Sequence, residues 1–297
     1  MTVEVHDDAA ALASAVAGEL ILRLVAAQAR GEVPQVALTG GSVAEKIHAQ
    51  LGRIGPDSDV DWTQVVFWWG DERYVAADSP DRNARSARAA FLDVVGADPA
   101  HVHEAPATDS GLSLADAAAS YGEAVRTHGS GWFEVLMLGV GPDGHVASLF
   151  PGHPALDVVD QVAVAVPDSP KPPPERISLS FGALQRCRAI FFVVSGEEKA
   201  DAVARALAPD GMPGATVHDT PARGVTGLPA TPDHPATHHI GCLDRPAASA
   251  LSGRVGASLH ASGAESARLD EYSPGFPQVG PCPDSTCVSP GSLREWT

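Results

Sequence analysis

The stretch that decides the fold runs from Phe133 to Pro151 and reads F-E-V-L-M-L-G-V-G-P-D-G-H-V-A-S-L-F-P. An apolar run of strand character ends in three closely spaced glycines, and a helix-like segment follows over residues 145–150. Open α/β sheets bind ligands at the carboxyl ends of their strands, beside the free N–H groups of the next helix. His145 is expected in such a pocket, with Asp143 placed to orient it; the alternative is an ordinary strand–helix turn with a surface histidine.

Apolar segments of strand character alternate with helical patterns along the first 207 residues. We predict strands at residues 3–5, 35–38, 65–69, 135–138, 162–166 and 190–194, and helices at 9–29, 43–51, 83–92, 114–127, 145–150 and 198–207. Continuously apolar strands separated by helices are typical of a parallel sheet that is covered on both faces. The expected fold class is therefore α/β, with a doubly wound, mostly parallel, Rossmann-like sheet.

Composition narrows the class of protein. The chain has 297 residues, of which 44% are hydrophobic, and a formal charge of −17. This charge argues against a nucleic-acid or anionic-membrane surface, although local Arg and Lys clusters still permit a small anionic substrate. We identify no apolar run of membrane-span length and no signal peptide, so we expect a cytoplasmic protein. The four cysteines form no C-x-x-C pair and are expected to be unpaired thiols.

A second glycine-rich turn ends the early segment V-A-L-T-G-G-S. Gly40, Gly41 and Ser42 close a predicted strand and open a predicted helix, so backbone N–H groups and a hydroxyl are available for a phosphate. The alternative is a plain strand–helix turn in which Ser42 is the N-cap. Neither the dinucleotide fingerprint nor the Walker loop matches this stretch.

Charged residues follow three further predicted strands. Asp71 and Arg73, in F-W-W-G-D-E-R-Y, are candidates for site chemistry, although a structural ion pair is the safer interpretation without context. Lys171 and Arg176 lie in D-S-P-K-P-P-P-E-R-I-S-L, where prolines stiffen a loop suited to phosphate capture; a solvated connector is the alternative. Lys199 begins a predicted helix, where the helix dipole disfavours a cation unless an anion is bound.

Metal chemistry has weak support in the sequence. His234, His238 and His239 include a metal-like spacing, but they lie in a proline-rich segment without supporting acids. No H-E-x-x-H helix and no G-x-S-x-G nucleophile elbow occurs. We predict no metal site.

Together these stretches resemble the 6-phosphogluconolactonase family, in order over residues 3–207 and onward to residue 251. The motifs that carry the resemblance are L-T-G-G-S, W-G-D-E-R-Y-V with the later D-R-N, L-G-V-G-P-D-G-H-V-A-S-L-F-P, S-P-K-P-P-P-E-R-I-S-L and S-G-E-E-K-A. The wider superfamily, with glucosamine-6-phosphate deaminase and ribose-5-phosphate isomerase, shares the doubly wound sheet.

The resemblance implies hydrolysis of 6-phospho-D-glucono-1,5-lactone to 6-phosphogluconate in the oxidative pentose phosphate pathway, without a metal or an organic cofactor. His145 resembles the general base that activates water, Asp143 the group that orients it, and Arg73 part of the substrate site. The resemblance also implies substrate or phosphate contacts, which are Gly40, Gly41, Ser42, Asp71, Lys171, Arg176 and Lys199. A small sugar phosphate lactone is the expected partner, with no nucleic acid, no membrane and a monomeric chain.

Two other functions stay open at this point. In the deaminase the D-G-H block continues to a glutamate five residues after the histidine, and Phe150 occupies that position here, although Asp71 is kept. A sugar-phosphate-sensing module of a transcription regulator is the non-enzymatic alternative. That class carries a basic helix-turn-helix, and neither end of this sequence shows one.

The C-terminal part departs from the family pattern. We expect an α/β domain over residues 1–251 and a disordered or non-native tail over 252–297, produced by divergence or a shifted reading frame. The family closes its sheet with a late strand, but residues 229–239, P-A-T-P-D-H-P-A-T-H-H, read nothing like one. A missing closing strand would leave an exposed sheet edge and lower stability.

Overall fold

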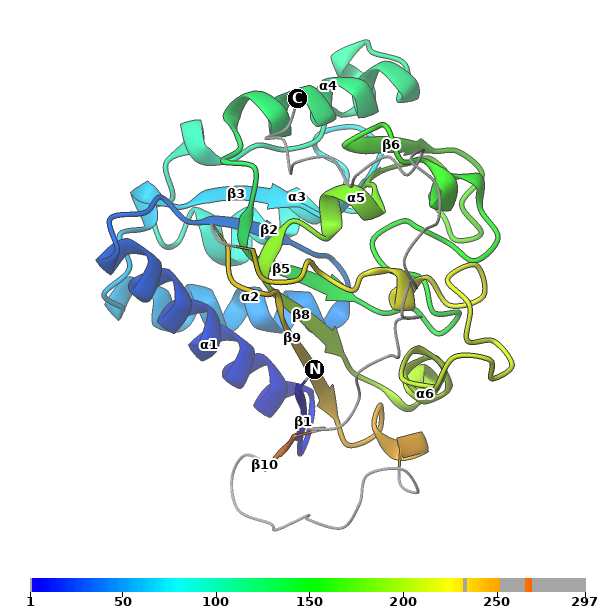
Figure 1. Cartoon of the computed structure of the whole chain (residues 1–297). Coiled ribbons are helices and arrows are strands. Elements are labelled where there is room, and N and C mark those ends of the chain that lie inside the picture. Colours follow the sequence, from blue (N-terminus) through cyan, green and yellow to red (C-terminus); the bar gives the residue numbers. More distant parts are fainter. Residues whose placement is uncertain (1, 232–233, 252–264, 269–297) are drawn as a thin grey trace, which may run out of the picture.

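The computed structural model describes residues 2–231, 234–251 and 265–268, and Figure 1 shows their arrangement. Within these residues the strands form a larger and a smaller sheet. The larger sheet has the spatial order β10 (Glu265–Arg268), β1 (Thr2–His6), β9 (His238–Asp244), β8 (Cys187–Val194), β5 (Phe133–Gly139), β2 (Gln35–Leu38) and β3 (Val66–Trp69). Its neighbours are parallel except β10 and β1, so the predicted mostly parallel α/β fold is confirmed.

Helices cover both faces of the larger sheet. One face carries α1 (Ala9–Ala29), α2 (Ser42–Ile54) and α3 (Asn83–Ala87), and the other carries α4 (Leu114–His128), α5 (Phe181–Leu184) and α6 (Ala200–Ala206). Residues alternate between the two cores along the central strands: in β5, Val135 and Met137 pack on the α1–α2 side, whereas Leu136 and Leu138 pack on the α4 side. Burial on both faces explains why the strands read as continuous apolar runs.

The smaller sheet was not predicted as a separate unit. It consists of β4 (Asp71–Arg73), β7 (Arg176–Leu179) and β6 (Ala163–Val166), all antiparallel. The predicted strand at 162–166 therefore belongs to this sheet and not to the parallel one, and two of its strands were missed. An apolar run indicates a strand but not its partner, because pairing is decided by contacts distant in the sequence.

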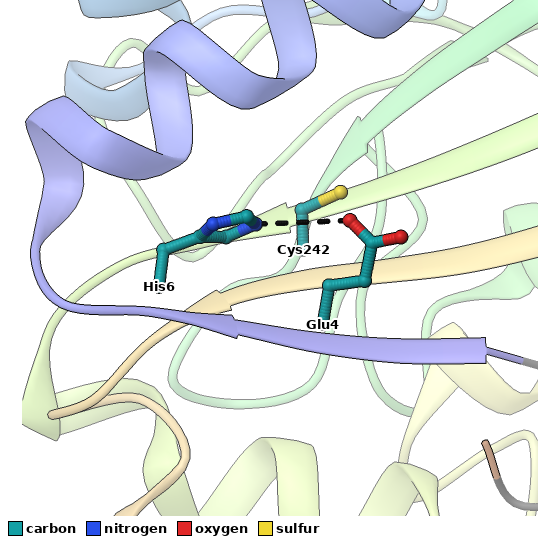
Figure 2. A group of neighbouring side chains, drawn as sticks. All are labelled: Glu4, His6 and Cys242. Atoms are coloured by element: carbon teal, nitrogen blue, oxygen red, sulfur yellow. Dashed lines mark ion pairs between the residues drawn. The ribbon is translucent and has the colours of Figure 1, made fainter. Parts of the chain in front are cut away.

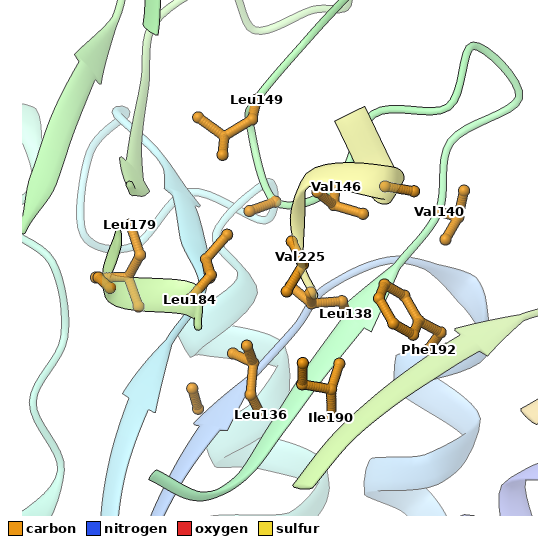
Figure 3. Packing of buried hydrophobic residues seen from close by; sticks show 14 of the residues in the cluster. Leu136, Leu138, Val140, Val146, Leu149, Leu179, Leu184, Ile190, Phe192 and Val225 are labelled. Atoms are coloured by element: carbon orange, nitrogen blue, oxygen red, sulfur yellow. The ribbon is translucent and has the colours of Figure 1, made fainter. Parts of the chain in front are cut away.

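The predicted helix at 145–150 is wrong. The segment is a compact loop in which Val146 forms isolated antiparallel bridges with Val140 and Leu149. Figure 3 shows Val140, Val146 and Leu149 in the apolar cluster above β5 and β8. Ala147 has a φ of 49°, which an α-helix excludes. Burial of these apolar side chains in one short loop overrides the helix-like spacing.

The closing strand exists, contrary to expectation. β9 begins at His238, inside the segment that reads unlike a strand, and lies between β8 and β1 with parallel ladders on both sides. The condition for an exposed edge at this position, a missing closing strand, is therefore not met. Of the expected tail, residues 265–268 form β10 along β1, and the remainder of 252–297 lies outside the described residues. The domain division thus stays a prediction.

The expectation that no apolar run reaches membrane-span length is wrong for helix α1. It is the helix in the described part that is long and apolar enough, by length and composition, to cross a membrane. Seven of its residues are buried at helical spacing, from Leu12 to Ala27, which is the pattern of a helix packed on a sheet. The cysteines behave as expected where they are described: Cys187 and Cys242 are free and buried, and Cys282 and Cys287 lie outside the described residues.

His48 on α2 generates a prediction about acid stability. Its ring stacks on Phe91 at a centroid distance of 6.2 Å, and neither ring nitrogen has a hydrogen-bond partner among the described residues. Burial lowers its pKa from 6.5 to about 4. In the unfolded chain this imidazole binds a proton near pH 6.5, whereas in the folded protein it binds one only near pH 4. The free energy of unfolding therefore falls as the pH drops from 6.5 to 4, by up to about 3 kcal/mol.

We expect His48→Phe to remove this part of the pH dependence. Urea unfolding of both proteins across that window should show a smaller loss of unfolding free energy in the variant. Equal losses in the two proteins would contradict the assignment.

Candidate active site

Two glycines shape the turn that follows β5. The Gly144 N–H donates to the Gly141 carbonyl at 2.8 Å, and the Gly141 N–H donates to the His145 carbonyl at 2.9 Å. A Cβ on Gly141 would lie 2.1 Å from the His145 ring and 2.5 Å from Asp143. Gly144 has a φ of +91°, and a Cβ there would come within 2.8 Å of Thr220. Both positions therefore require glycine: His145 and Asp143 cross directly over Gly141, and Gly144 combines a positive φ with close contact to Thr220.

The candidate base and its orienting acid are in contact. His145 Nδ1 lies 2.5 Å from Asp143 Oδ1. An ionised carboxylate can only accept, so Nδ1 donates its proton and Nε2 remains as the basic nitrogen. The pKa of Asp143 is lowered: desolvation raises it, but the hydrogen bond and charge of His145 and the charge of Lys171 outweigh that effect. The His145 side chain is 16% exposed, so the ring is shielded but reachable.

Lys171 joins this pair from the smaller sheet. It lies on the proline-rich loop between β6 and β7, and its Nζ is 3.5 Å from Asp143 Oδ1 and 3.3 Å from His145 Nδ1. Its ammonium therefore faces the Asp143 carboxylate from the side of the loop. The rigid-loop interpretation is supported over a solvated connector, because the loop brings its cation to the pair.

Arg176 holds the Lys171 loop in place. Its guanidinium donates to the carbonyl oxygens of Pro173, Lys171 and Pro172 at 3.1–3.2 Å. It also lies 5.8 Å from the Phe150 ring, which in turn contacts the His145 ring at a centroid distance of 4.6 Å. The buried guanidinium thus contacts the loop in three places, whereas the sequence predicted a phosphate contact.

Asp71, on β4 of the smaller sheet, anchors the loop that follows β5. Ser148 Oγ donates to Asp71 Oδ2 at 2.5 Å, and the Ser148 N–H donates to Ser178 Oγ at 3.2 Å. Both Asp71 and Ser148 are buried. Ser148 was missed by the sequence reasoning, although it stands three residues after His145 in the quoted stretch. A small hydroxyl residue beside a functional histidine was the available signal.

Arg73 lies directly opposite Arg176 in the β4–β7 register. One guanidinium nitrogen of Arg73 donates to the Asp81 carbonyl at 2.5 Å, and its Nε is buried with no hydrogen-bond partner among the described residues. Burial lowers the pKa of Arg176, and the nearby Arg73 lowers it further while Asp71 raises it. No ion pair joins Asp71 to Arg73 in the described part; the Asp71 carboxylate accepts from Ser148 instead.

The Gly40–Ser42 turn opens α2 at the same sheet edge. Gly41, with a φ of +94°, is the N-cap, so Ser42 is the first helical residue and not the cap. No side chain caps this helix start, which leaves its first N–H groups available. Gly40 packs so closely on Asn83 that a Cβ would lie 1.9 Å from the amide oxygen. The turn follows β2, the parallel neighbour of β5.

Lys199 is the predicted residue that stays apart from the group. Its ammonium pairs with Glu198 at 2.9 Å, in the turn between β8 and α6. Arg205, which no sequence motif marked, contacts the turn: it donates to the Pro142 carbonyl at 3.3 Å and lies 3.4 Å from Thr220 Oγ1. Both contacts support the 141–145 turn from distant parts of the chain.

A cavity of about 750 Å³ lies elsewhere. It is lined by residues at the amino ends of the strands, among them Gln35, Val66, Glu134 and Arg188. His145 follows the carboxyl end of β5, so this cavity lies at the opposite ends of the strands. We place the candidate site at the carboxyl edge, because all the contacts of His145, Asp143 and Lys171 converge there.

Comparison with known proteins decides the family. Residues 7–228 match the family described as glucosamine-6-phosphate isomerases/6-phosphogluconolactonase. The chain belongs to this family. It is 40% identical over 236 residues to a 6-phosphogluconolactonase of Streptomyces coelicolor, covering 76% of this chain and 88% of that protein.

Solved structures agree with this assignment. The 6-phosphogluconolactonase of Trypanosoma brucei superposes with a TM-score of 0.66 and 26% identity, covering 84% of this chain and 98% of that one. A monomeric glucosamine-6-phosphate deaminase has a TM-score of 0.68 at 18% identity, covering 84% and 100%. The second likeness concerns the fold alone.

The close passage of His145 over Gly141 predicts that Gly141→Ala displaces the imidazole from Asp143. Loss of the Nδ1–H donor contact should then move the ring toward a mixture of tautomers, which histidine side-chain ¹⁵N NMR detects. Gly18→Ala is the matched control, since nothing lies within 4 Å of its Cβ position. An unchanged His145 signal in the Gly141 variant would refute the geometry.

Proposed function

We propose that this family member is a 6-phosphogluconolactonase, an ester hydrolase that converts 6-phospho-D-glucono-1,5-lactone to 6-phosphogluconate in the oxidative pentose phosphate pathway. The observation that carries the proposal is the 2.5 Å contact of His145 with Asp143, which leaves Nε2 as a base at the carboxyl edge of the sheet. The 40%-identical relative bears the same name and is matched over 88% of its length.

The chemistry needs one base and one region of positive charge. His145 Nε2 takes a proton from water as the water oxygen attacks the lactone carbonyl, and Asp143 stabilises the resulting imidazolium. Lys171 supplies positive charge beside the developing oxyanion. The imidazolium then protonates the ring oxygen as the ester bond breaks, and the carboxylic acid product releases a proton to solvent. A δ-lactone is already activated, so no covalent intermediate is needed.

We assign the phosphate end of the substrate to the start of α2 and to the guanidinium groups of Arg73 and Arg176. The uncapped start of α2 at Gly41 and Ser42 offers N–H groups and the positive end of a 13-residue helix. Arg73 and Arg176 stand opposite each other, and like charges in register are unfavourable unless an anion lies near them. Remote phosphate binding would position the carbonyl over His145.

The deaminase alternative is disfavoured at one position. The acid expected five residues after the histidine is replaced by Phe150, whose buried ring packs on His145. An aromatic ring therefore stands at the sequence position where the deaminase has its glutamate. Glucosamine 6-phosphate should release no ammonia with this protein, whereas the lactone should be hydrolysed.

Replacing the base tests the mechanism. His145→Gln should lower kcat by about 10²- to 10⁴-fold, since proton transfer by a positioned side chain contributes that much. Freshly generated lactone is mixed with protein, and acid release is followed above spontaneous hydrolysis. His218→Gln, at a side chain 59% exposed, is the control and should retain activity. Full activity of the His145 variant would remove this residue from the mechanism.

A charge at the start of α2 tests the phosphate assignment. Ser42→Asp should raise KM about tenfold or more with a smaller effect on kcat, because a carboxylate would repel the phosphate. Ser42→Asn has nearly the same size without the charge and is the matched control. An equal KM for both variants would move the phosphate elsewhere.

We further propose that the enzyme acts in the cytoplasm as a monomer. The free buried thiols in the described part fit a reducing compartment, and the charge of −17 opposes self-association. Light scattering after size exclusion should give a mass near 30.6 kDa. A mass of twice that value would show a dimer.

A further inference from the structure

Three side chains with metal-binding atoms converge beneath α1, on the far side of β8 from β5. Glu4 and His6 are two residues apart on β1, so both point to the same face of the sheet. Cys242 on β9 is the parallel partner of Glu4 and points to that face as well. The carboxylate, imidazole and thiol atoms all lie within 4.8 Å of one another, and Figure 2 shows them facing one another.

The cluster contains a polar group that the fold leaves unsatisfied. His6 is 7% exposed, and its Nε2 is buried without a hydrogen-bond partner in the described part of the chain. The nearest Glu4 oxygen is 3.8 Å away, too far for a hydrogen bond. Such a group normally costs stability unless something binds it. Cys242, 4% exposed, packs in the same core as Leu12 and Val16 of α1.

We propose that Glu4, His6 and Cys242 form a Zn²⁺ site that joins the first strand of the sheet to its closing strand. Zinc takes sulfur, nitrogen and oxygen ligands at about 2.0–2.3 Å in tetrahedral geometry, which separates ligand atoms by about 3.4 Å. The 3.8 Å His6–Glu4 separation is already near this value, and no pair of the three ligand atoms is more than 4.8 Å apart. A thiolate and an imidazole disfavour Ca²⁺ and Mg²⁺, which prefer oxygen ligands.

The site would hold three protein ligands and leave the fourth position to water. Glu4, whose side chain is 33% exposed, provides the side open to solvent. Zinc replaces the Cys242 thiol proton, which leaves to the buffer, and takes up the unpartnered lone pair of His6 Nε2. β8 separates the two strands of the site, β1 and β9, from β5 and its turn, so the expected role of the site is stability and not hydrolysis.

Cobalt substitution tests the site with a signal specific to sulfur. Untagged full-length protein, stripped of metal, is titrated with Co²⁺, and a thiolate-to-cobalt charge-transfer band is expected in the near ultraviolet. Cys242→Ser should abolish this band. Cys187→Ser is the matched control, because Cys187 is also a free buried thiol on the larger sheet but lies in the opposite core, and it should retain the band.

A second variant covers the case in which Cys242→Ser does not fold. Glu4→Gln changes a partly exposed side chain and should weaken Zn²⁺ binding, measured by competition with a chromophoric chelator, by more than about tenfold. Zn²⁺ at about 100 times its Kd should raise the Tm of the natural sequence by roughly 5–10 °C, and this rise should shrink in the variant. A cobalt band that survives in folded Cys242→Ser, or unchanged Zn²⁺ affinity in Glu4→Gln, overturns the proposal.

Discussion

The hydrogen bond between His145 and Asp143 is the constraint around which the carboxyl edge of the sheet is built. It selects one imidazole tautomer, and it requires a backbone bare enough at Gly141 for the two side chains to cross. A carboxylate whose pKa is lowered by its cationic neighbours stays ionised wherever the imidazole can act as a base. The loop after β5 is correspondingly tied to the core by apolar side chains on both sides of the turn.

The smaller sheet positions this pair from the other side. Asp71 on β4 accepts from Ser148, and Arg176 on β7 ties down three carbonyls of the loop that carries Lys171. These are buried, charge-assisted hydrogen bonds, and removing one partner leaves a charged group unsatisfied in a low dielectric. Residues that resemble ligand contacts in the sequence therefore also act as the framework of the site.

Some residues around the turn could be selected from local sequence patterns, whereas others reach it only through contacts distant in the sequence. His145, Asp143 and Lys171 could be selected from the sequence because glycine and proline patterns mark loops that follow strands, and the structure brings these three together. Arg205 and Thr220 could not, since they reach the turn through contacts more than 60 residues away. The helix expected at 145–150 failed because its apolar spacing serves a loop that is buried on several sides.

The amino-acid sequence by itself determined the class of fold and the order of most elements, and it singled out His145 and Asp143, whose side chains the structure brings into contact. Continuous apolar strands separated by helices can bury both strand faces in one way, as a covered parallel sheet. The tertiary structure alone decided which sheet each strand joins, that β9 closes the larger sheet, and that Glu4, His6 and Cys242 meet beneath α1. The closing strand and the three-residue cluster depend on pairing between residues more than 200 positions apart, and the smaller sheet depends on the pairing of Asp71 with Ser178. No local pattern carries a signal for such pairings.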